Sequence, residues 1–226
     1  MNKNEKFVIT INRELGSGGR TVGRLLAENL GVEFYDKALI KGLEEKYNLT
    51  VEEIEKLKGS KKNWWADFTR VVSVGPAIIS TYSQQQKSYG TSLPTTAEMF
   101  KAESEILRGI ADNESCVVAG RSGFFVLRNH PNHLSILIQA SMPYRVERLC
   151  RKQGLSKEEA RKIIDQVAKM RENYVKKYTD TSRYDTRNYD VVITMDGLSE
   201  EYVADLILDY FNQRCRETGS FLPTNG

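Results

Sequence analysis

A glycine-rich turn between an apolar strand and a helix constrains this chain more than any other feature. Residues 7–12 (FVITIN) form an apolar, β-branched run that predicts a buried strand. The turn Gly16-Ser17-Gly18-Gly19 follows, and apolar residues then recur at helical spacing over 21–30. This order places backbone N–H groups and the positive end of the helix dipole at one point. The stretch therefore predicts a phosphate-binding loop.

The loop resembles the Walker A pattern G-x-x-x-x-G-K-[ST], with two departures. When the pattern is anchored on Gly19 and Thr21, Glu14 stands at the first glycine and Arg20 at the lysine. Arg20 keeps the positive charge, but its planar guanidinium differs from a compact ammonium. The Thr21 hydroxyl is a suitable ligand for Mg²⁺ held between phosphates. We expect Gly16–Gly19 to bind nucleotide phosphates, with a plain flexible turn as the alternative.

Composition and charge exclude several classes of function. The 226 residues suffice for one core, and 33 basic against 30 acidic residues are too balanced to indicate a nucleic-acid or membrane partner. The cysteines Cys116, Cys150 and Cys215 lack metal-ligand spacing and fit reduced thiols. No apolar run is long enough to span a membrane, and no signal peptide is visible. We expect a cytoplasmic protein with small-molecule partners; formation of a homo-oligomer stays open.

Strand and helix candidates alternate along most of the chain. The expected strands are 7–12, 33–35, 115–119, 134–139 and 189–194, and the expected helices are 21–30, 37–47, 97–113, 144–153, 157–177 and 200–216. Alternation of this kind predicts an α/β fold, a five-stranded parallel sheet flanked by helices. Ligands of such sheets bind at the carboxyl ends of the strands, where the glycine-rich turn lies.

Two residues at predicted strand ends are candidate ligands of the substrate. Arg121 follows the third strand between two glycines, and its guanidinium suits a bidentate grip on a phosphate. A surface arginine is the alternative. Asp36 follows the second strand and either caps the next helix or contacts the substrate.

Two later helices carry many basic residues. Arg145, Arg148 and Arg151 recur at a spacing of three, and Arg171 continues the positive charge on the next helix. Phosphoryl transfer from a triphosphate needs such charge, and a mobile basic flap would also exclude water. Interleaved glutamates leave a solvated helix face as the alternative. Arg148, Arg151 and Arg171 are therefore candidates for neutralising charge during transfer.

Several other residues carry weaker signals. His130 and His133 flank Pro131 and are interpreted as turn residues, with no indication of a metal. Trp64 and Trp65 fit the core or an oligomer contact, and stacking on a base is the alternative.

Three stretches resemble the bacterial cytidylate kinase-like proteins, a branch of the P-loop nucleoside monophosphate kinases. The first is ITINRELGSGGR at residues 9–20, close to the family form I-x-I-[SN]-R-x-x-G-S-G-G-R. The second is CVVAGR at 116–121 with VLRNHP at 126–131, where family members use the arginine after the glycine to grip the monophosphate. The third is 171–178 with the final strand at 189–194.

The resemblance implies one P-loop kinase domain over residues 1–226. Its core would comprise 1–36, 114–151 and 181–217, with a monophosphate-binding insertion at 37–113 and a lid at 152–180. The activity implied is transfer of the γ-phosphoryl group of ATP to a nucleoside monophosphate, CMP or dCMP first, with Mg²⁺. Ser122 replaces an aspartate that cytidylate kinases have after this arginine, and only Arg171 survives of their lid pattern. A kinase for another metabolite, a nucleotide-binding sensor and an interaction module stay as alternatives.

Overall fold

The computed structural model describes residues 1–36, 97–120 and 122–217. Several expectations lie outside the described residues: the helix at 37–47, the pair Trp64 and Trp65, and the side chain of Arg121. Most of the predicted insertion lies there as well.

The predicted five-stranded parallel sheet is confirmed. Its strands follow the order β2-β3-β1-β4-β5, and every neighbouring pair is parallel. The strands are β1 Val8–Arg13, β2 Glu33–Tyr35, β3 Cys116–Ala119, β4 His133–Gln139 and β5 Val191–Thr194. His133 is therefore the first residue of β4, and its interpretation as a turn residue was wrong. The central strand β1 carries the glycine-rich turn at its carboxyl end.

The helices largely follow the predicted ranges. They are α1 Gly19–Leu30, α6 Ala97–Asn113, α7 Gly123–Val126, α8 Met142–Gln153, α9 Lys157–Thr179 and α10 Glu200–Glu217, with a 3-10 turn η2 at Thr186–Asn188. Helix α9 begins with a capping box between Ser156 and Glu159. The short α7 was not predicted, because four residues are too few to show helical periodicity.

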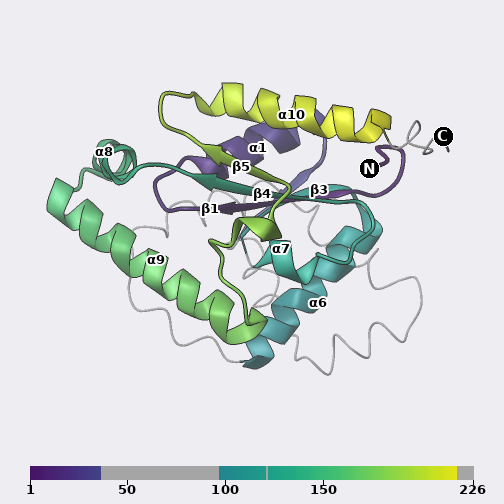
Figure 1. The fold of residues 1–226 in the computed structure, drawn as a ribbon, viewed down its shortest axis with the longest axis horizontal. Coiled ribbons are helices and arrows are strands. Elements are labelled where there is room, and N and C mark those ends of the chain that lie inside the picture. The colour runs from purple at the N-terminus through teal and green to yellow at the C-terminus, as the bar shows by residue number, and fades with distance from the viewer. Residues whose placement is uncertain (37–96, 121, 218–226) are drawn as a thin grey trace, which may run out of the picture.

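Helices cover both faces of the sheet. Figure 1 shows α1 and α10 on one face, and α6, α7 and α9 on the other. Alternate residues of β1 account for this: Ile9 and Ile11 pack in the core beneath α1 and α10, whereas Val8 packs with α6. Because all five strands are parallel, the carboxyl ends of β1, β2 and β3 meet at one edge. No helix in the described ranges is both long and apolar enough to cross a membrane.

Candidate active site

The glycine-rich turn adopts the conformation that anion binding requires. Gly16 and Gly18 have φ angles of 85° and 90°, which L-residues with side chains rarely adopt. The Ser17 hydroxyl donates to the Glu14 carbonyl at 3.0 Å, and helix α1 begins directly after Gly18. The first amides of a helix lack partners within the helix and can point at an anion. The structure thus brings residues 16–19 together as a cradle at the start of α1.

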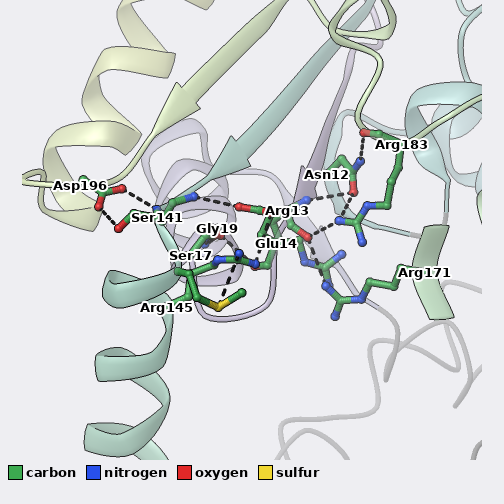
Figure 2. Close-up of polar contacts among 12 residues, drawn as sticks. Asn12, Arg13, Glu14, Ser17, Gly19, Ser141, Arg145, Arg171, Arg183 and Asp196 are labelled. Carbon is green, nitrogen blue, oxygen red and sulfur yellow. Dashed lines mark hydrogen bonds and ion pairs between the residues drawn. The ribbon is translucent and has the colours of Figure 1, made fainter. Parts of the chain in front are cut away.

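The turn is held firmly against helix α8. An ideal Cβ on Gly16 would lie 2.8 Å from the Arg145 carbonyl oxygen and 2.9 Å from Leu149 Cδ1, so the backbone packs directly on the helix. Glu14 reaches the same region: its Oε1 pairs with Arg145 Nη1 at 3.3 Å, and its Oε2 accepts from the Ala140 amide at 3.1 Å. Figure 2 shows Glu14 and Arg145 together on one side of the turn. The Glu14 carboxylate therefore anchors the turn to α8 and to the residue that follows β4.

Arg20 and Asp36, two predicted site residues, bind each other. Arg20 Nε donates to Asp36 Oδ2 at 2.7 Å, and Nη2 lies 2.5 Å from the same oxygen. The Arg20 side chain is 55% exposed, whereas that of Asp36 is only 10% exposed. The guanidinium predicted at the lysine position is thus tied to the end of β2.

Arg148 and Thr21, also predicted, lie together. Arg148 Nη2 donates to Thr21 Oγ1 at 3.3 Å and pairs with Glu200 Oε1 at 2.5 Å. Arg148 is buried, so its charge is compensated by Glu200 rather than by water. Glu200 was missed in the sequence, because an acidic residue at a helix start is an ordinary stabiliser of the helix dipole.

Arg171 and Arg183 converge on the carboxyl end of β1. Arg171 Nη1 donates to the Arg13 carbonyl at 3.2 Å, and Arg183 Nη2 donates to the same oxygen at 2.6 Å. Arg183 Nη2 also reaches Asn12 Oδ1 at 3.2 Å. Figure 2 shows both arginines approaching from the side opposite Arg145. Arg151, in contrast, is exposed on α8 and is not brought into this group.

Arg13 itself completes the basic cluster. Its guanidinium donates no hydrogen bond within the described part of the chain, although four charged groups act on it. Burial, followed by the charges of Arg171, Arg183 and Arg20, lowers the pKa of Arg13 to about 9, and Asp36 acts in the opposite direction. Such an unfavourable concentration of positive charge is relieved by a bound anion.

Sequence reasoning missed the roles of Arg13 and Arg183. Arg13 belongs to the quoted family stretch, but it follows the predicted strand 7–12, so the alternation of that strand was not extended to its side chain. Arg183 lies in the loop between α9 and η2, where no periodicity exists, and it is only 2% exposed. Its burial follows from contacts with Asn12 and Arg13, which are distant in sequence.

Comparison with known proteins agrees with this architecture. The chain is 30% identical to a cytidylate kinase of Thermotoga sp. (strain RQ2), over 92% of this chain and 98% of the relative. It is 24% identical to a cytidylate kinase of Methanopyrus kandleri, over 86% and 87% of the two chains. A crystal structure of an uncharacterized protein from Eubacterium ventriosum ATCC 27560 superimposes with a TM-score of 0.64 at 22% identity, over 92% of this chain and 99% of that one.

The match to the family extends over most of the chain. The sequence profile of the cytidylate kinase-like family aligns with residues 8–197, from the first strand to the loop before α10. This range includes the glycine-rich turn and the whole basic cluster. The resemblance seen in the sequence is therefore confirmed: the chain belongs to the cytidylate kinase-like family and is a kinase-like phosphotransferase.

Proposed function

We propose that the protein transfers the γ-phosphoryl group of ATP to a nucleoside monophosphate, with CMP or dCMP as the first candidates. The observation that carries this proposal is the concentration of guanidinium groups at the end of β1, directly beside the glycine-rich turn. The names of the two relatives, both cytidylate kinases, support cytidine nucleotides as acceptors.

The reaction needs little covalent help from the protein. A phosphate oxygen of the acceptor attacks the γ-phosphorus, one P–O bond forms, and the bond to the bridging oxygen of ADP breaks. An ionised acceptor phosphate has no proton to lose, so no strong general base is required. Catalysis then rests on positioning and on neutralising charge.

The predicted site residues receive the following roles in the proposal. Gly16, Ser17, Gly18 and Gly19 would hold the donor phosphates through their amides. Arg121 would hold the acceptor phosphate. Arg148, Arg151 and Arg171 would neutralise charge during transfer, and Asp36 would contact the substrate. Arg20, which is paired with Asp36, would add positive charge beside the donor phosphates.

Magnesium fits this donor set only together with a nucleotide. Among the residues that the structure describes, no group of three or more histidine, cysteine or acidic side chains is arranged so that it could hold a metal ion. Mg²⁺ in phosphoryl-transfer sites commonly takes one or two protein oxygens, and phosphates and water complete its shell. The Thr21 hydroxyl would provide such an oxygen once Arg148 releases it. When bound, the ion would neutralise charge on the transferring phosphates.

A kinase for a different small acceptor is the second candidate. Ser122 stands where cytidylate kinases have an aspartate, and its buried hydroxyl has no hydrogen-bond partner in the described part of the chain. A short hydroxyl side chain therefore stands in place of that carboxylate, beside the proposed acceptor ligand Arg121 in the sequence, which favours a changed acceptor.

The proposal is tested by measuring ADP release with Mg-ATP and a panel of acceptors. CMP, dCMP, UMP, AMP and GMP are compared with a reaction that contains no acceptor. We expect CMP or dCMP to raise ADP release at least about a hundredfold over the acceptor-free rate, since positioning of two reactants contributes that much or more. Stimulation by none of the nucleotides, with ATP binding still measurable, would transfer the proposal to another small acceptor.

A further inference from the structure

We infer that Arg13 supplies the positive charge that the lysine supplies in the Walker A pattern, and that it does so from the opposite end of the loop. This inference rests on the proposed function and names a further residue of the same site. Three observations carry it: the conformation of the loop, the space beside Gly19, and the reach of the Arg13 side chain.

The conformation of the loop shifts the count of the pattern by one residue. A positive φ is the conformation that requires a glycine. The residue directly before helix α1 with such a φ is Gly18. Gly19 is already the first residue of α1 and has no positive φ. Counting from Gly18, the first glycine of the pattern falls on Arg13, and the lysine falls on Gly19. The pattern's hydroxyl then falls on position 20, so Thr21 would reach the metal from the next residue.

The lack of space beside Gly19 explains why positions 13 and 19 both depart from the Walker A pattern. An ideal Cβ on Gly19 would lie 2.7 Å from Arg13 Cβ, closer than real Cβ atoms approach other atoms, and 3.2 Å from Ile138 Cβ, which is a tight contact. A side chain at position 19 and a side chain at position 13 thus exclude each other. The Walker A pattern has a glycine at the position of Arg13 and a lysine at the position of Gly19. This chain has the cation at position 13 and the glycine at position 19.

The Arg13 side chain extends from the loop to the end of β3. An ideal Cβ on Gly120 would lie 2.0 Å from Arg13 Nη1, so the guanidinium lies across this glycine. Gly120 has a φ of 86° and directly follows the buried strand β3. The stem of Arg13 therefore packs beside the proposed donor-phosphate cradle, while its charge lies at Gly120, the residue before the proposed acceptor ligand Arg121. A cation in that place bridges the transferring phosphoryl group and the acceptor.

The surroundings prepare Arg13 for an anion. Its carbonyl oxygen accepts hydrogen bonds from Arg171 and Arg183, which fix the backbone and surround the guanidinium with positive charge. Burial first, and then the charge of Arg171, lowers the pKa of Arg13. Arg20 differs because the Asp36 carboxylate already compensates it. Arg13 is thus the better placed of the two to respond to a phosphate.

The test compares the affinities of the wild-type protein and of Arg13→Ala for ADP and for a non-hydrolysable ATP analogue. If Arg13 contacts the terminal phosphate, the variant should bind the ATP analogue at least about tenfold more weakly, while its affinity for ADP stays within about threefold, since the lost contact is a charge-assisted hydrogen bond to that phosphate alone. Turnover should fall about a hundredfold or more, as for the removal of one preorganised donor.

A matched control is Arg24→Ala, which removes an arginine from the exposed face of α1; its side chain is 61% exposed. This variant should resemble the wild type in both affinities. A second variant, Arg13→Gly combined with Gly19→Lys, restores the order of the ordinary pattern. It should recover the preference for the ATP analogue and at least about tenfold of the turnover that Arg13→Gly alone loses.

The outcomes separate this inference from the proposed function. Failure of the wild type to bind either nucleotide removes the proposed function, and the inference with it. A wild type that binds the ATP analogue, together with a folded Arg13→Ala that binds it equally well, overturns the inference alone. If Arg13→Ala does not fold, Arg13→Gly combined with Gly19→Lys decides. A preference of this double variant for the ATP analogue supports the inference that Arg13 takes the place of the lysine. A folded double variant without that preference contradicts the inference.

Discussion

Replacement of Gly16 by alanine is expected to lower turnover at least about a hundredfold, because a displacement of about 1 Å in a positioning element has effects of that size. The new Cβ would meet the Arg145 carbonyl oxygen at 2.8 Å and the Arg145 Cβ at 2.9 Å, and neither backbone nor Cβ can turn away. The φ of 85° adds backbone strain of about 1–2 kcal/mol. The turn must therefore move off α8, and its amides leave the phosphate positions.

The effect of crowding is separated from that of backbone strain by a second glycine. Gly31 also has a positive φ, of 65°, but nothing lies within 4 Å of its ideal Cβ. Gly31→Ala should thus lose about 1 kcal/mol of stability and keep its turnover. Steady-state rates and thermal melts of both variants provide the comparison. Equal loss of turnover in the two proteins would show that strain, and not the contact with α8, controls the site.

The fold could be predicted from the sequence because its signals are local. An apolar run, a glycine-rich turn and a helical spacing within about two dozen residues predict strand β1 and helix α1. Parallel pairing then follows from the alternation of strands and helices. Helix α7 escaped because its four residues carry no period of their own.

The candidate site could be predicted only in part, since its side chains meet through long-range contacts. The phosphate cradle follows from Gly16 to Gly19 alone. The partner of Arg20, in contrast, is set by where β2 ends, and the ion pair with Asp36 cannot be read from either residue. Arg183 reaches β1 across 170 residues of chain. Such contacts depend on the order of strands in the sheet, which no local pattern specifies.

Stability is expected to fall as the pH is lowered through the titration range of His133. This half-buried residue begins β4, and its Nε2 lies 2.7 Å from Thr10 Oγ1 on β1. Burial, aided by the nearby His130, lowers the pKa of His133 to about 4, from an ordinary value near 6.5, although Asp190 acts in the opposite direction. Between these values the unfolded chain binds a proton that the folded chain does not. Stability is therefore unaffected above about pH 6.5, and it decreases by up to about 3 kcal/mol as the pH falls toward 4.

Urea titrations at several pH values between 7 and 4 measure this loss. In His133→Asn, whose amide can still bond Thr10, the loss between pH 7 and pH 4 should be smaller than in the wild type by about 2–3 kcal/mol. His130→Asn keeps His133 and should retain most of the wild-type decline. Because Thr10 lies at the centre of β1, protonation of His133 would disturb the strand that carries the phosphate loop. Parallel decline of the wild type and His133→Asn would instead assign the acid sensitivity to other groups.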